Sequence, residues 1–100
     1  MSVREKIVAR AVQDLGIKED PPKSNKVEYN DWYYEGTTIN AAWCATFVSF
    51  CYNYGDNPLP NIDTYNGFGY VPTIYFKAIK NGWIVADKTK AKPADIVIYD

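Results

Sequence analysis

The chain has 100 residues, of which 47% are hydrophobic, 16% aromatic and 23% charged, and its formal net charge is −1. This length is that of one domain, and the hydrophobic content is enough for a core, which excludes an intrinsically disordered protein. The near-neutral charge without a basic block argues against a nucleic-acid partner, and the longest apolar run is too short to span a membrane.

Residues 2–15 are predicted to form the first helix. Ser2 and Glu5 have the spacing of a capping box, and Gly16 is a suitable stop. The apolar residues recur at intervals of three and four and form one stripe: Val3, Ile7, Val8, Ala11, Val12 and Leu15. Because the chain enters this helix directly, without an apolar stretch of the secretory type, no signal peptide is predicted.

Residues 17–40 are predicted to be a long connection. Pro21 and Pro22 exclude a helix at their position, and a polar loop of this length in a small domain is usually functional or mobile. Its aromatic side chains need a surface to pack on, which argues against mobility. Two interpretations of this aromatic group stay open, a structural flap and a wall of a binding groove. The group consists of Tyr29, Trp32, Tyr33 and Tyr34.

Residues 42–54 are predicted to form a central, buried helix, because apolar side chains occur on all of its faces. Asn40 is the expected N-cap and Gly55 the expected end. Cys44 falls in the first turn, and Cys51 follows about 10 Å further along the axis, which is too far for a disulfide between them. The sequence therefore predicts two free thiols, with Cys51 in a structural position.

The remaining residues are predicted to contain a loop, a helix and two strands. The Asp and Asn residues of the loop 55–69 lack the spacing of a calcium-binding loop and are typical of turns, so neither a metal nor another cofactor is expected. Residues 72–80 form the third helix, with Pro72 in its first turn. Residues 83–86 and the β-branched run 95–99 are predicted strands. Two strands alone are a marginal sheet, so the predicted α+β fold has an incomplete antiparallel sheet.

Cys44 is the candidate nucleophile. The N–H groups at a helix N-terminus stabilise a thiolate and can also hold the oxyanion of a tetrahedral intermediate. Acyl transfer through a thioester also needs a base, normally His, and the sequence contains no His. Since buried cysteines are common and inert, the residues alone leave both a catalytic and a core role open for Cys44.

Three segments resemble one protein family, in the family's order. Residues 43–51, Trp-Cys-Ala-Thr-Phe-Val-Ser-Phe-Cys, resemble the nucleophile helix of CHAP domains, the cysteine- and histidine-dependent amidohydrolases/peptidases. The form Trp-Cys-Ala-x-Phe-Val-Ser is that of a subgroup found in bacterial cell-wall hydrolases and phage endolysins. Residues 23–33 resemble the segment upstream of that cysteine. Residues 92–100 resemble the Pro-Gly-Asp-Ile-Val strand that precedes the family's catalytic His, with Ala94 in place of Gly.

This resemblance implies that residues 1–100 are the N-terminal, nucleophile-bearing part of one papain-like α+β CHAP domain. It implies a peptidoglycan hydrolase, either a cysteine endopeptidase or an N-acetylmuramoyl-L-alanine amidase, in which Cys44 forms an acyl-enzyme. The protein would be made in the cytoplasm and act at the bacterial cell wall, as a phage lysin or an exported hydrolase. The expected substrate-binding side chains are aromatic: Tyr29, Trp32, Tyr33, Trp43 and Phe68.

The family's His lies beyond the matched segments, and Asp100 cannot replace it, so the chain alone is expected to be inactive. Two other interpretations stay open. One is a binding module that keeps an aromatic cell-wall groove, with Tyr34 as a further member, but no longer cuts. The other is a split enzyme, in which a second chain supplies the His strand and pairs with the edge of residues 95–99.

Overall fold

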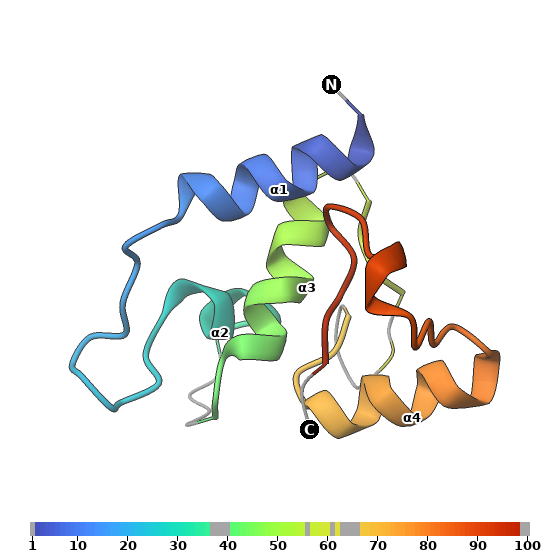
Figure 1. Ribbon diagram of the computed structural model, residues 1–100. Helices are drawn as coiled ribbons and strands as arrows, with labels where there is room; N and C mark the ends of the chain where they lie inside the picture. The colour runs from blue at the N-terminus through green and yellow to red at the C-terminus, as the bar shows by residue number, and fades with distance from the viewer. Residues whose placement is uncertain (1, 37–40, 56, 61, 63–66, 99–100) are drawn as a thin grey trace.

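The computed structural model describes residues 2–36, 41–55, 57–60, 62 and 67–98. Within these ranges it contains α1 (Val3–Gln13), α2 (Glu28–Tyr33), α3 (Cys44–Tyr54), α4 (Val71–Asn81) and the short 3-10 helix η1 (Lys88–Lys90). α3 is the central helix, because both α1 and α2 contact it. α1 crosses the C-terminal end of α3, α2 lies beside its N-terminal part, and α4 lies on the opposite side (Figure 1).

The three helices predicted from the sequence are confirmed. α1 begins with the expected capping box, in which Ser2 Oγ accepts a hydrogen bond from the Glu5 amide at 3.1 Å and the Glu5 carboxylate accepts one from the Ser2 amide at 3.2 Å. α4 has Pro72 in its first turn, and the left-handed Gly82 ends it. α3 begins at Cys44 with Trp43 as its N-cap. The predicted N-cap, Asn40, lies outside the described residues.

α3 separates two apolar clusters, which explains why apolar residues cover all of its faces. On one side Val27, Tyr29 and Phe50 are buried, with Trp32, Trp43 and Phe47 packed against them. On the other side Ala45, Phe68 and Ile74 are buried and contact α4 and the C-terminal segment. The predicted central position of this helix is therefore confirmed.

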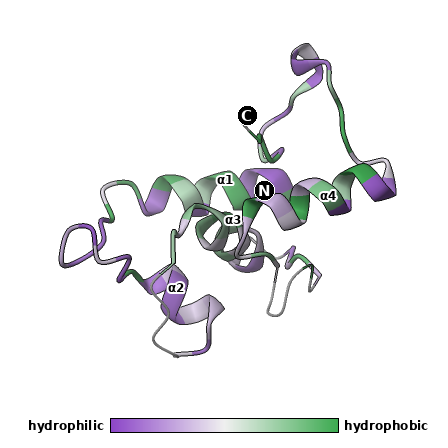
Figure 2. Cartoon of the chain, turned by 90° about the horizontal axis from the view of Figure 1, so that it is seen from below, coloured by the Kyte–Doolittle hydropathy of each residue, from purple (hydrophilic) through white to green (hydrophobic). Residues whose placement is uncertain are grey.

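α2 lies within the stretch 17–40 that the sequence predicts to be non-helical, so that prediction is wrong at residues 28–33. Its residues are hydrophilic on the hydropathy scale (Figure 2), yet Tyr29, Asn30 and Tyr33 are buried. Tyr and Asn have an apolar or compact body that packs well and polar atoms that need partners. The helix is thus stabilised by packing on α3 and not by its own periodicity or by a capping side chain.

The predicted α+β class is wrong, because the described part of the chain contains helices and no strand. Residues 83–87 and 95–98 have no regular secondary structure and are not paired in a ladder; residue 99 lies outside the described ranges. Val85 and Val97 are exposed, at 68% and 61%, so the run at 95–98 is also not the buried strand that its β-branched residues indicated. Strand propensity reflects a fit to a sheet surface, and here the described residues offer no neighbouring strand.

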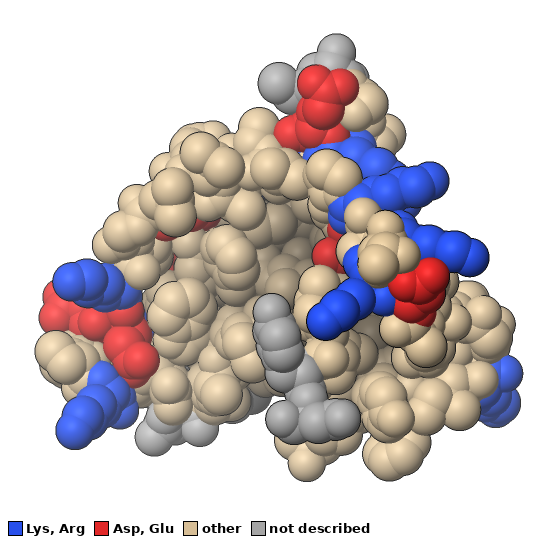
Figure 3. All heavy atoms as spheres, in the orientation of Figure 1, with Lys and Arg blue, Asp and Glu red and all other residues tan. Residues whose placement is uncertain are grey.

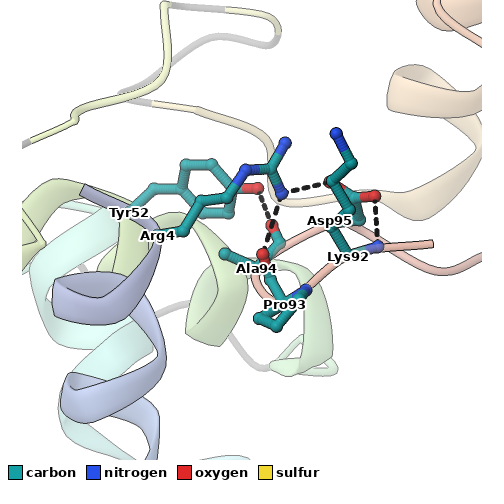
Figure 4. Close-up of polar contacts among 6 residues, drawn as sticks. All are labelled: Arg4, Tyr52, Lys92, Pro93, Ala94 and Asp95. Carbon is teal, nitrogen blue, oxygen red and sulfur yellow. Dashed lines mark hydrogen bonds and ion pairs between the residues drawn. The ribbon is translucent and has the colours of Figure 1, made fainter. Parts of the chain in front are cut away.

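The C-terminal segment is held against the helices by a cluster of polar contacts, which we term the C-terminal clamp (Figure 4). The Arg4 guanidinium donates to the Pro93 carbonyl at 2.8 Å and to the Asp95 carboxylate at 2.6 Å. The Tyr52 hydroxyl of α3 donates to the Ala94 carbonyl. These bonds join α1 and α3 to a segment about 90 positions away from Arg4 in the sequence.

Candidate functional site

Cys44 is the first residue of α3, and its side chain is exposed, whereas Cys51 of the same helix is 4% exposed. Both thiols are free, as the sequence predicts. The Trp43 side chain makes no capping hydrogen bond, so no side chain of the N-cap residue covers the amides of the first turn. The exposed thiol therefore stands at a helix end whose amide groups face away from the helix body.

The carbonyl of Trp43 has two donor groups within hydrogen-bond distance. The Phe47 amide donates to it at 2.9 Å, which is the first bond of the α3 ladder, and the Thr46 hydroxyl lies 3.0 Å from it. A peptide bond is planar, so fixing this carbonyl also fixes the amide of Cys44 on the other side of the same plane. The direction of the Cys44 N–H is thus set by contacts of its neighbours.

The Thr46 hydroxyl also faces the side chain of Asn30, and both residues are buried, at 0% and 3% exposed. The hydroxyl lies 2.8 Å from Asn30 Oδ1. Asn30 Nδ2 donates to the Asn25 carbonyl and to the Ala41 carbonyl, each at 2.9 Å. Asn30 therefore connects α2 to the segment that leads to Cys44.

These contacts close into a ring of hydrogen bonds around the start of α3. The Glu19 carboxylate accepts from the Asn25 amide, and its other oxygen accepts from the Trp43 indole nitrogen at 3.4 Å. Asn25, Asn30, Thr46 and Trp43 complete the circuit through the bonds given above. We call these five residues, Glu19, Asn25, Asn30, Trp43 and Thr46, the polar ring.

A second hydroxyl anchors α3 on its other side. The Ser49 hydroxyl accepts from the Phe68 amide at 3.0 Å and lies 3.1 Å from the Ala45 carbonyl. Ser49 is buried, and a Cβ built on Gly67 would lie 2.5 Å from its hydroxyl oxygen, so this contact is close-packed. Thr46 and Ser49, the two hydroxyl residues of the segment Trp43–Ser49, thus contact different neighbours of α3: Thr46 contacts α2, and Ser49 contacts Phe68.

The aromatic side chains predicted to bind substrate occupy different positions. Tyr29, Tyr33 and Phe68 are 0%, 1% and 2% exposed, so in this structure their rings belong to the core. Trp32 and Trp43 are partly exposed and border the same cluster as Tyr29, with the Tyr29 and Trp43 ring centroids 5.6 Å apart. Phe68 lies in the other cluster, beyond α3. The structure therefore brings Tyr29, Trp32 and Trp43 together and separates Phe68 from them.

An apolar cleft of about 450 Å³ opens between α1, α3 and the C-terminal segment. Ile7, Val8 and Val12 line one wall, Val48 and Cys51 a second, and residues 94–97 a third. The corresponding face is hollowed at its centre, where uncharged residues predominate (Figure 3). Burial raises the pKa of the Cys51 thiol to about 11, and Asp14 adds to this effect while Arg10 opposes it. The Cys51 thiol, which lines the cleft, is therefore protonated at neutral pH.

Groups of three or more potential metal ligands are not found in the part of the chain that the structure describes. Within the same ranges, none of the helices has both the length and the hydropathy needed to cross a membrane. Comparisons of the chain with protein-family models, with curated proteins and with solved structures found no match. The CHAP resemblance thus rests on the quoted segments alone.

The sequence pattern indicates Cys44 at the start of a helix but does not indicate Asn30, Thr46 and Glu19 as its neighbours. Asn30 lies in a stretch predicted to be a loop, so it had no predicted face. The sequence did contain one signal. Asn30 lies directly after Tyr29 and three positions before Tyr33, in a segment whose aromatic side chains need a packing surface. A buried polar residue there requires hydrogen-bond partners, which would have pointed to nearby main-chain groups.

Proposed function

We propose that this chain carries the nucleophile of a cysteine hydrolase that cleaves an amide bond in the peptide part of peptidoglycan, with Cys44 as the attacking group. One observation carries the proposal: the exposed Cys44 thiol lies at the first residue of the central helix, beside the polar ring. The substrate class comes from the resemblance of residues 23–33, 43–51 and 92–100 to CHAP domains.

In the proposed reaction the Cys44 thiolate attacks the amide carbonyl carbon, and the carbonyl oxygen takes up the negative charge. The amide N–H groups at the start of α3 are suited to that oxyanion. The tetrahedral intermediate expels the amine, which takes a proton, and leaves a thioester on Cys44. Water then attacks the thioester, releasing the carboxylic acid and regenerating the thiol.

Both steps need a group that moves protons, and this sequence contains no His to do so. The proposal therefore requires a His-bearing segment, either further along the same polypeptide or on a second chain. The 100 residues alone are expected to react once with an activated electrophile but not to turn over peptidoglycan.

The first test separates nucleophile from base. The purified chain is incubated with an electrophilic analogue of the peptidoglycan stem peptide, and labelling is located by peptide mass spectrometry. Labelling of Cys44 that saturates with probe concentration supports the proposal. Equal, non-saturating labelling by a scrambled peptide of the same composition contradicts it. Cys44→Ala is the variant that reports labelling elsewhere.

The second test uses a form of the protein that includes the His-bearing segment. Purified peptidoglycan is digested, and the new amino groups and the soluble fragments are identified by mass spectrometry. The wild type is expected to release fragments, and Cys44→Ala and Cys44→Ser to lose release by at least about a thousandfold. Undiminished cell-wall clearing by Cys44→Ala would overturn the proposal.

A further inference from the structure

Two members of the polar ring, Asn30 and Thr46, are buried, and both have hydrogen-bond partners. The side-chain amide of Asn30 uses both of its nitrogen protons, on Asn25 and Ala41, and its oxygen lies 2.8 Å from the Thr46 hydroxyl, whose single proton is shared between this oxygen and the Trp43 carbonyl. A buried polar pair contributes little net stability compared with a well-packed apolar pair, because its desolvation opposes its hydrogen bonds. What such a pair can add is a single fixed geometry for the main chain that it binds.

The main chain bound in this way is the segment that ends at Cys44. Asn30 holds the Ala41 carbonyl, and Thr46 contacts the Trp43 carbonyl at 3.0 Å. In a trans peptide the N–H points opposite to the carbonyl of the same plane. Because the Trp43 carbonyl points along α3 toward Phe47, the Cys44 N–H points out of the helix start.

We propose that Asn30 and Thr46 are positioning residues that orient the Trp43–Cys44 peptide and thereby set the reactivity of the Cys44 thiol. This inference rests on the proposed function for its biological meaning, but it concerns the thiol itself. Glu19 contacts the same segment through the Trp43 indole. The ring thus couples α2 and the residue 19–25 loop to the nucleophile.

The test measures Cys44 alkylation by iodoacetamide in the intact chain, from pH 5 to pH 10, with each thiol followed separately by peptide mass spectrometry. Thr46→Val removes the hydroxyl with little change in shape. It is expected to slow Cys44 alkylation at pH 7 by at least about threefold and thereby to shift the profile to lower rates. Thr46→Ser keeps the hydroxyl, so its Cys44 alkylation rate is expected to stay within about 1.5-fold of the wild-type rate. Asn30→Leu is expected to act in the same direction as Thr46→Val.

The matched control is Ser49→Ala. It removes another buried hydroxyl from the same helix, one that is bonded to Phe68 and not to Trp43. It is expected to lower the melting temperature but to leave the pH profile of Cys44 unchanged. This comparison separates loss of stability from loss of positioning, since each variant is measured well below its own melting temperature.

Two outcomes overturn the inference. One is a folded Thr46→Val chain whose Cys44 profile coincides with the wild type. The other is a shift of the same size in Ser49→Ala, which would make the effect a general consequence of loosening α3. If Asn30→Leu does not fold, the comparison of Thr46→Val with Thr46→Ser still tests whether the polar ring sets the reactivity of Cys44. Failure of the proposed function gives a different pattern, in which the alkylation profiles shift as expected but Cys44→Ala retains hydrolysis in the His-containing form.

Discussion

Ala94 has a positive φ of 73°, in the left-handed region that glycine adopts without strain. This is the position at which the resembling CHAP segment has Gly. An L-residue in this region costs roughly 1–2 kcal/mol, while glycine gives back roughly 0.5–1 kcal/mol through the entropy of the unfolded chain. We therefore expect Ala94→Gly to raise the free energy of unfolding by about 0.5–1 kcal/mol, measured by urea denaturation.

The control for this prediction is Ala94→Val. A β-branched residue at the same φ has more steric conflict, so it is expected to destabilise the chain. The Tyr52 hydroxyl bonds the carbonyl of residue 94, which both variants keep. A lower free energy of unfolding in Ala94→Gly would mean that the left-handed conformation of residue 94 does not reduce the stability of the chain.

Cys51 provides a prediction about the two thiols. Burial raises its pKa to about 11, so at pH 8 its thiolate fraction is about 100-fold below that of an ordinary thiol. Iodoacetamide at pH 8 is expected to label Cys44 and to spare Cys51 until urea unfolds the chain. The folded state keeps a proton that the unfolded state loses, so the stability contributed by the neutral thiol falls as the pH rises above about 9 toward 11. Rapid labelling of Cys51 in the folded chain would contradict its buried position.

At the scale of the elements, α1 and α4 were predictable from an apolar period of three to four and a start or stop signal. α3 was predictable because apolar residues cover all of its faces and Gly55 follows it. α2 was not, because its six residues are too few for a period and its N-cap, Val27, offers no side-chain acceptor. Its helix exists because Tyr29 and Trp32 pack on α3. Likewise, Cys44 could be placed from its own helix, whereas Asn30 and Thr46 meet across 16 positions and only tertiary structure brings them together.

Gly55, the C-cap residue of α3, lies against α1. A Cβ built there would lie 2.5 Å from Ile7 Cγ1 and 2.8 Å from Ile7 Cα. The φ of Gly55, −92°, suits any L-residue, so alanine at this position would be resisted by packing and not by backbone strain. Gly55→Ala is expected to lower the free energy of unfolding by about 1–3 kcal/mol, because the two helices must separate.

A double-mutant cycle checks that cause. In an Ile7→Ala background the Cγ1 contact is gone, so Gly55→Ala should cost less than it does in the wild type. Urea denaturation of the four chains gives the coupling free energy directly. Additive costs would show that the Ile7 side chain does not cause the loss of stability in Gly55→Ala.

For the whole molecule, the failure to predict the fold class and the clamp has one cause. The runs at 83–87 and 95–98 have the composition of strands, but a strand is defined by a partner, and local sequence does not reveal whether one is present. The C-terminal segment instead binds Arg4 and Tyr52 and forms one wall of the apolar cleft. That contact spans almost the entire sequence, so neither spacing nor periodicity could indicate it.

The clamp should make the attachment of the C-terminal segment sensitive to acid. The hydrogen bond from Arg4 and the Lys92 amide lower the pKa of the Asp95 carboxyl below its usual value of 3.8. A group whose folded pKa is lowered contributes stability that is complete above its unfolded pKa and is lost as the pH falls through the folded value. Hydrogen exchange of residues 92–98, corrected for the intrinsic pH dependence, is therefore expected to accelerate below about pH 4.

Variants of the two charged partners identify the group that titrates. Asp95→Asn removes the ionisable carboxyl, so protection of residues 92–98 should be lower than in the wild type at pH 6 and should no longer change near pH 4. Arg4→Met keeps much of the aliphatic contact but removes the donor, and it should lower protection at pH 6. Both partners are exposed, so salt should weaken the same attachment in the wild type but not in Asp95→Asn. An unchanged acid transition in Asp95→Asn would assign it to another carboxylate and leave the clamp dependent on the bonds of Arg4 and Tyr52 to main-chain carbonyls.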